Sequence, residues 1–154
     1  MDLSKNEAKL LKEAYRLIAD YDKYFPETET AISDFENKYG VIPSDYRYLL
    51  QEYGGCHFLD PWIFTIKELS ESFADLANGY EHDNIVSNDN VFPVGSLGCG
   101  SYVCVIKETG KIAILPHDEY VEAIDDLEII ANSFKELVMN LATMRVELER
   151  QIRG

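Results

Sequence analysis

The segment from residue 35 to residue 55, FENKYGVIPSDYRYLLQEYGG, constrains the fold more than any other part of this chain. Ile32, Phe35 and Tyr39 recur at the spacing of an α-helix, which predicts one buried helix face. Gly40 then stands where helices commonly end, because glycine tolerates the left-handed backbone conformation of that position. A first helix is therefore expected to stop at a sharp turn just after Tyr39.

A second helix is predicted immediately after this turn. Pro43 suits its first position, where a missing N–H costs nothing, and Ser44 and Asp45 can accept hydrogen bonds from the free backbone N–H groups. A buried stripe at i, i+3, i+4 and i+7 follows, formed by Tyr46, Leu49, Leu50 and Tyr53. Gly54 and Gly55 end the helix. This segment therefore predicts two packed helices joined by a tight corner.

Three capping boxes predict further helices, since a Ser or Thr and a Glu three residues later satisfy the first N–H groups of a helix. They begin at Ser4, Thr65 and Ser133. The helix that begins at Ser4 should end near Tyr24, and the helix that begins at Thr65 should end at Asn78–Gly79. The closing helix is expected to be lined by Phe134, Leu137, Val138, Leu141, Met144 and Leu148.

The hydrophobic period changes from that of a helix to that of a strand after residue 90. Short β-branched and aromatic runs predict strands at residues 91–94, 102–106 and 111–115. Residues 56–59 predict a short strand before a turn at 60–62, and residues 120–124 an edge strand. Helices, then a meander of strands, then a helix indicate an α+β fold with a central antiparallel sheet packed with helices and flanked by terminal helices.

Composition and charge exclude several classes of protein. A length of 154 residues predicts one domain spanning residues 1–154, and 46% apolar residues are too many for a disordered chain. Twenty-eight acids against 14 bases give a net charge of −14, which argues against direct binding of nucleic acid. The charge favours a basic protein partner, although an acidic surface can also serve solubility alone.

The cysteines and the N-terminal sequence predict the compartment. Cys56, Cys99 and Cys104 are odd in number and lack CxxC spacing, which predicts reduced thiols in a cytosol. The segment DLSKNEAK after Met1 has no secretory character, and no apolar run approaches the ~18 residues of a membrane span. A soluble cytoplasmic protein without a membrane partner is therefore expected.

No arrangement in the sequence predicts catalysis, a metal site or a cofactor. The glycine-rich residues 95–100 lack the GK[ST] ending of a phosphate loop and precede a strand. Cys56 and His57 would point to opposite faces of a strand, so they cannot act as nucleophile and base. His82 and His117 have no metal-ligand spacing. A protein that is not an enzyme and holds no cofactor is expected.

The acids indicate where a partner would bind. Residues 68–105 contain six acids and residues 112–134 another six, and neither stretch has a Lys or Arg. Both surround the predicted sheet and would suit a basic protein, although such runs can be plain solvated surface. Trp62 and Tyr102 are candidate aromatic anchors, with a place in the core as the alternative. The predicted partner-binding residues are Trp62, Glu81, Asp83, Tyr102, Asp118, Glu119 and Glu122.

The first helical pair also resembles the opening signature of the SUKH superfamily of Smi/Knr-like proteins, through Phe35-Glu36, Gly40, Pro43, Asp45-Tyr46, Leu49-Leu50 and Tyr53-Gly54-Gly55. Later blocks are similar in the same order, namely Phe92-Pro93-Val94-Gly95, Gly98, Gly100, Tyr102, Gly110-Lys111-Ile112, His117-Asp118, Ala131, Ser133-Phe134 and Leu137. The resemblance spans about residues 28–142, with the N-terminal helix and the C-terminal helix extension outside it. Asn132 departs from the pattern, because members often carry an acid there.

The resemblance implies a Smi/Knr-like fold and a bacterial immunity protein that neutralises a cognate polymorphic toxin by non-catalytic occlusion. Such toxins are frequently nucleases with basic substrate-binding surfaces, so the acidic balance favours a basic nuclease toxin and charge mimicry. The superfamily also contains regulatory scaffolds of the cell-wall or signalling type, which are the first alternative. A small-ligand or metal-binding domain and an unrecognised enzyme are the others.

Overall fold

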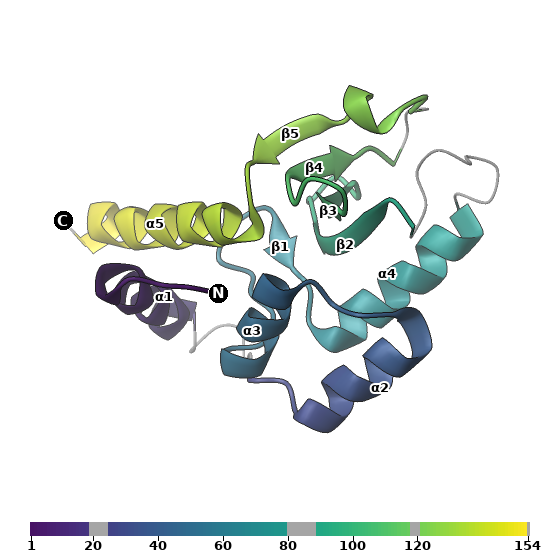
Figure 1. Cartoon of the computed structure of the whole chain (residues 1–154). Helices are drawn as coiled ribbons and strands as arrows, with labels where there is room; N and C mark the ends of the chain where they lie inside the picture. The colour runs from purple at the N-terminus through teal and green to yellow at the C-terminus, as the bar shows by residue number, and fades with distance from the viewer. Residues whose placement is uncertain (19–24, 80–88, 118–120, 154) are drawn as a thin grey trace.

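A computed structural model describes residues 1–18, 25–79, 89–117 and 121–153, except the side chains of 75–79. These parts form an α+β fold with one antiparallel sheet, as the sequence predicted (Figure 1). The helices are α1 (Lys5–Ile18), α2 (Glu29–Tyr39), α3 (Ser44–Glu52), α4 (Ile66–Gly79), the 3-10 helix η1 (Ile124–Asp126) and α5 (Phe134–Arg153). The strands are β1 (Trp62–Ile63), β2 (Val91–Ser96), β3 (Tyr102–Ile106), β4 (Ile112–Leu115) and β5 (Glu128–Ala131).

The sheet follows the chain, with strand order β1-β2-β3-β4-β5. Alternate residues of its strands pack into two separate cores, because successive side chains point to opposite faces. One face joins the main core with the helices, and α2 and α4 lie together beside it (Figure 1). The other face packs Cys104, Ala113 and Leu115 against Leu127, with Val121 and Ile124 alongside. The segment before β5 thus closes the second face.

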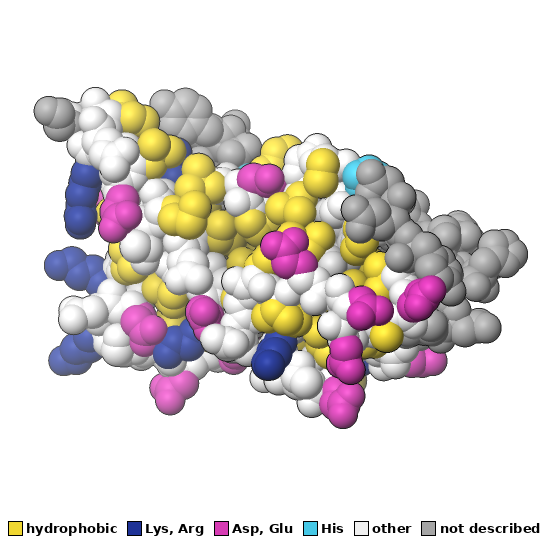
Figure 2. Space-filling model, turned by 90° about the horizontal axis from the view of Figure 1, so that it is seen from above, with side chains coloured by type: hydrophobic (Ala, Val, Ile, Leu, Met, Phe, Trp, Pro, Cys, Tyr) yellow, Lys and Arg dark blue, Asp and Glu magenta, His cyan; other side chains and the backbone are white. Residues whose placement is uncertain are grey.

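Charge is distributed unevenly over these elements. Helices α1 and α5, which lie side by side, contain eight basic and five acidic residues, a net charge of +3. The rest of the chain contains six basic and 23 acidic residues, a net charge of −17. In Figure 2 the Lys and Arg side chains gather at the end of the molecule that α1 and α5 form, and acidic side chains dominate the opposite end. The protein therefore carries its positive charge mainly at the α1–α5 end and its negative charge over the rest of the molecule.

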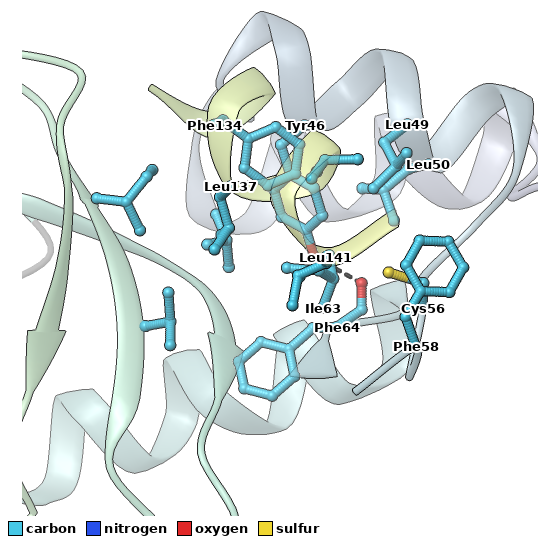
Figure 3. Close-up of a cluster of buried hydrophobic side chains, with 14 of the residues drawn as sticks. Tyr46, Leu49, Leu50, Cys56, Phe58, Ile63, Phe64, Phe134, Leu137 and Leu141 are labelled. Atoms are coloured by element: carbon cyan, nitrogen blue, oxygen red, sulfur yellow. Dashed lines mark hydrogen bonds between the residues drawn. The ribbon is translucent and has the colours of Figure 1, made fainter. Parts of the chain in front are cut away.

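The main core is built around Tyr46, which is fully buried, as are Leu49 and Leu50 on the same stripe of α3 (Figure 3). The Tyr46 hydroxyl donates a hydrogen bond of 2.7 Å to the backbone carbonyl of Phe64. Its ring lies 5.2 Å from the ring of Phe134 at the start of α5. The predicted stripe is thus the contact through which α3 joins the sheet region to the closing helix.

The corner between α2 and α3 is held by Glu36, which the sequence marked as part of the family resemblance without giving it a structural role. The carboxylate of Glu36 accepts a hydrogen bond of 3.0 Å from the Ile42 N–H and another of 3.0 Å from Nε of Arg47. Gly40 has φ +115°, as its predicted role requires. The predicted cap of α3 was wrong, because Pro43 lies one position before the helix and no side chain bonds its first N–H groups.

The capping boxes at Ser4 and Thr65 are confirmed. In the first, the Ser4 N–H donates to Glu7 at 2.9 Å and the Glu7 N–H donates to the Ser4 hydroxyl at 3.2 Å. The box at Ser133 has an altered return bond, since the N–H of Asn132 donates to Glu136 at 3.2 Å. Helix α4 ends at Gly79 as predicted, and the expected end of α1 near Tyr24 lies outside the described residues.

Two strand predictions were wrong. Residues 56–59 form only one bridge, from Cys56 to Ile63, and the strand is Trp62–Ile63, of which Trp62 was predicted to belong to the turn at 60–62. Residues 121–124 contain no strand, because this segment lies across the second face of the sheet, and β5 forms later, at Glu128–Ala131. The strands predicted near 91–94, 102–106 and 111–115 are confirmed.

The buried face of α5 differs from the prediction at its C-terminal half. Met144 is 49% exposed, and Val146 is buried in its place. Residues 134, 138, 142 and 146 follow one helix face at a spacing of four, and α1 covers the far end of that face beside Leu17. Within the described residues, no helix has the length and apolar character needed to cross a bilayer.

Candidate partner-binding site

The strand register brings both predicted aromatic anchors to one end of the sheet. Trp62 lies opposite Ser96, Ser96 opposite Tyr102, and Tyr102 opposite Leu115. These four residues form a row across β1, β2, β3 and β4. The loop of residues 97–101, which joins β2 to β3, projects beyond this row. The two aromatic residues are 40 positions apart in the sequence but share this end of the fold.

A hollow of about 720 Å³ adjoins the row. It is lined by Leu97, Cys99, Ser101, Ile114, Pro116, His117, Val121, Glu122, Asp126, Leu127 and Glu128. Three of these side chains are carboxylates, and no Lys or Arg is among them. We call Trp62, Tyr102 and the residues lining this hollow the acidic sheet end. It combines an apolar floor with a negative rim, which suits a basic partner side chain.

Trp62 is 47% exposed, and its inner face is supported by a histidine. Its ring stacks on His57 with centroids 4.1 Å apart and planes 14° apart. Nε2 of His57 lies 3.4 Å from a carboxylate oxygen of Glu68. Burial alone would raise the pKa of Glu68, but hydrogen bonds from His57 and Thr65 hold that pKa below its ordinary value. Trp62 is therefore an accessible aromatic surface in a fixed orientation.

Tyr102 has a different environment from Trp62. It is only partly exposed, and its ring meets Phe64 edge-on at 6.2 Å. It packs against the main core and also against the second core beneath the other face of the sheet. Most of its ring area therefore packs in the core, so the structure favours a core role for Tyr102 over a role as a partner-binding anchor.

The loop between β2 and β3 is fixed at both ends. The Gly98 N–H donates a hydrogen bond of 2.9 Å to Oδ1 of Asp60, which ties the loop to the turn before β1. Ser101 is 5% exposed, and its hydroxyl lies 3.0 Å from Nδ1 of His117. The N–H of His117 also donates to that hydroxyl at 3.4 Å. These bonds hold the rim of the hollow in place.

The contact between Ser101 and His117 has the spacing of a nucleophile and its base, and sequence reasoning missed it because the residues are 16 positions apart. Ser101 lines the hollow with only 5% of its surface exposed, and its hydroxyl already accepts a hydrogen bond from the N–H of His117. The two side chains instead hold the loop against the end of β4. Within the described ranges, no three His, Cys, Asp or Glu side chains are placed to hold a metal ion.

Cys99 is the exposed thiol of the three cysteines. A backbone hydrogen bond from Ser101, aided by its hydroxyl at 3.7 Å from the sulfur, lowers the pKa of Cys99 below that of an ordinary thiol. Burial raises the pKa of Cys56 to about 12, and burial also raises the pKa of Cys104. A thiolate therefore forms most readily at the rim of the hollow.

One equivalent of a thiol reagent such as iodoacetamide should modify Cys99 before the other two cysteines react. At pH 8 its rate should exceed that of a free cysteine peptide, because more of the thiol is ionised. Peptide mapping after timed quenching gives the order of modification. The outcome that contradicts this expectation is labelling of Cys56 or Cys104 in the folded protein at a rate comparable to that of Cys99.

The remaining predicted contacts divide into two groups. Glu122 lines the hollow and is exposed, as expected for a partner-binding residue. Glu81, Asp83, Asp118 and Glu119 lie outside the described residues, so their role stays a prediction. Asp126 and Glu128, which the sequence reasoning did not single out, join Glu122 at the hollow. The signal for them was the base-free stretch 112–134, in which they were two of six acids.

Comparison with known proteins shows to which protein family this chain is related. The sequence profile of the SMI1 / KNR4 family (SUKH-1) matches residues 26–140, which is most of the 154-residue chain. The chain belongs to the SMI1/KNR4 (SUKH-1) family. The matched segment of this SUKH-1 protein contains the whole acidic sheet end, whereas α1 and the larger part of α5 lie outside it. The resemblance seen in the sequence is thereby confirmed.

A curated relative extends the match beyond the family segment. The SPbeta prophage-derived uncharacterized protein YokK of Bacillus subtilis (strain 168) is 28% identical over 158 aligned positions. The alignment covers 82% of this chain and 81% of the relative. The two proteins are therefore similar over most of their lengths.

Proposed function

We propose that this SUKH-1 protein is an immunity protein that binds a cognate toxin in the cytoplasm and blocks it without catalysis. Membership of the family fits this role, and the matching relative is named as a prophage-derived protein. The observation that carries the proposal is the acidic sheet end, where an exposed Trp62 lies at the same end of the sheet as a hollow lined by Glu122, Asp126 and Glu128. This end lies inside the segment that the family shares.

The proposed partner is a basic toxin domain, and a nuclease fits best. A nuclease presents Lys and Arg to the phosphate backbone of its substrate, so three carboxylates on one rim can form ion pairs with the same Lys and Arg side chains. The net charge of −14 would accelerate encounter with such a surface and repel nucleic acid. Trp62 would supply the buried aromatic contact on which slow dissociation depends.

The deciding experiment uses a nuclease toxin domain encoded next to this gene, expressed in cells and also purified. The double variant Glu122→Lys/Asp126→Lys should lower the association rate about tenfold or more at low salt, because it reverses two charges on the rim. The matched control Asp34→Lys/Glu52→Lys changes the net charge equally on α2 and α3, at two exposed acids. It should change the rate far less.

Two outcomes would count against the proposal in different ways. If the Glu122/Asp126 variant protects cells as well as wild type and binding is indifferent to salt, the charge-mimicry mechanism is wrong. If the wild-type protein neither binds the toxin domain nor protects the cells, the immunity role for that pair is wrong. Both variants should keep the thermal midpoint of the wild type, because exposed charges contribute little to folding.

A further inference from the structure

A second hollow lies between α1 and α5, which lie wholly or largely outside the segment that matches the family. Lys135 at the start of α5 lies 3.1 Å from Glu7 at the start of α1, so the two helices run in the same direction. A groove of about 740 Å³ lies between their C-terminal halves. It is lined by Lys9, Lys12, Glu13, Arg16, Leu17, Val146, Glu149, Arg150 and Arg153.

The charge of this groove is opposite to that of the protein. Its lining contains five basic and two acidic residues, a net charge of +3, in a chain whose net charge is −14. Figure 2 shows the same end of the molecule carrying most of the visible Lys and Arg side chains. The groove is lined by residues of α1 and α5, whereas the acidic sheet end is formed by β1, β3, β4, the loop at 97–101 and residues 116–128, so the two charged regions share no element.

Three of the five groove cations form no salt bridge with an acid in the described part of the chain, although Arg16 and, more weakly, Arg150 lower the pKa of the Glu13 carboxyl. Arg16 pairs with Glu13 at 2.6 Å, and Arg153 pairs with Glu149 at 2.7 Å. Lys9, Lys12 and Arg150 form no salt bridge among those residues, and all three are exposed. The two acids of the groove therefore neutralise only part of its positive charge, and a net charge of +3 remains.

The groove also offers apolar contact. Leu17 and Val146 lie at its floor, with only 9% and 6% of their surfaces exposed. The aliphatic stems of Lys and Arg side chains can cover an apolar ligand while their charged ends remain in water. Lys9, Lys12 and Arg16 follow one face of α1 over about 10 Å, or roughly two helical turns. A ligand that matches this groove needs both apolar and acidic groups over that length.

We propose that the α1–α5 groove is a docking site for an acidic amphipathic segment of a partner protein other than the basic toxin. A helix about two turns long can place carboxylates against the exposed side chains of Lys9, Lys12 and Arg150 and an apolar side chain between them. A long nucleic acid is a poorer ligand, because it would extend beyond the groove into the field of a protein with 28 acids. Screening over about 8 Å lets a short segment experience mainly the local positive charge.

The test uses fluorescein-labelled 14-residue peptides with the purified full-length protein. One peptide has leucine at every third or fourth position and glutamate elsewhere, and its counterpart has glutamine in place of glutamate. The acidic peptide should bind at least tenfold more tightly than the glutamine peptide, measured by fluorescence anisotropy. A labelled single-stranded 10-mer DNA is the competing class of ligand and should bind more weakly than the acidic peptide.

Variants locate the site. Lys12→Glu/Arg150→Glu should weaken binding of the acidic peptide at least tenfold, whereas Lys67→Glu/Lys111→Glu, which makes the same change in net charge at exposed positions away from the groove, should weaken it less than twofold. Amide shifts in the NMR spectrum of the wild-type protein should concentrate on α1 and α5. The proposal is overturned if the acidic peptide does not bind, if both double variants weaken it equally, if the DNA binds more tightly, or if the shifts fall elsewhere.

Discussion

Leu50→Ala is expected to lower the free energy of unfolding by about 2–5 kcal/mol, the range for truncation of a fully buried leucine. Leu50 has no exposed surface and lies on the α3 stripe beside Tyr46 and Leu49, in the middle of the main core (Figure 3). The substitution removes three carbon atoms from a site that helices and sheet enclose. The rigid surroundings cannot close the resulting cavity, so contacts are lost in addition to the transfer free energy.

Urea unfolding monitored by circular dichroism measures this loss. Ile152→Ala is a suitable control, because it also truncates a large aliphatic side chain in a helix but removes one that is 69% exposed. Its midpoint should lie close to that of wild type. An unchanged midpoint for Leu50→Ala would show that the α3 stripe is not part of the core, and the account of how α3 joins α5 to the sheet would be wrong.

Gly95→Ala is expected to destabilise the protein by about 3 kcal/mol and to displace β1 from the sheet. A Cβ atom at position 95 would overlap the carbonyl oxygen of Trp62, and this obstacle is backbone, so no side-chain rotation can relieve it. Gly95 pairs with Ile63 across the ladder between β2 and β1. The added methyl group therefore pushes apart the pairing that presents Trp62 at the acidic sheet end.

Two readouts distinguish this effect from a general loss of stability. Urea unfolding reports the change in free energy, and the emission of Trp62, the sole tryptophan of the chain, reports its stacking on His57. Gly98→Ala is the matched control, since a Cβ there meets nothing closer than Oδ1 of Asp60 at 3.9 Å, an ordinary contact. If Gly95→Ala matches Gly98→Ala in both stability and Trp62 emission, the close approach of β1 to β2 is not a constraint on this site.

Interactions between neighbours in the chain could be predicted from the sequence. The capping boxes at Ser4 and Thr65 form because their hydroxyl and carboxylate partners are three residues apart, so helix geometry alone brings them together. Gly40 has a positive φ where a turn was predicted, since its local backbone demands it. The exposure of Glu122 agrees with its place among the acids of the base-free stretch 112–134.

The tertiary structure decided whatever depends on packing between distant segments. Residues 121–124 look like a strand by composition, yet Val121 and Ile124 cover the second face of the sheet, and β5 forms after them. Trp62 and Tyr102 share one end of the sheet through strand register, and burial then separates them into an accessible ring and a largely buried one.

Both hollows are lined by segments that are distant from each other in the sequence. The acids of the first and most of its apolar lining come from one base-free stretch, but the loop between β2 and β3 adds Leu97, Cys99 and Ser101 from the other side. The cations of the second come from α1 and α5, which are more than 100 residues apart in the chain. The sequence by itself determined the helices, the caps at Ser4 and Thr65 and the sign of each charged stretch, because these depend on neighbouring residues. Only the packing of distant elements decided which charged residues line a common hollow.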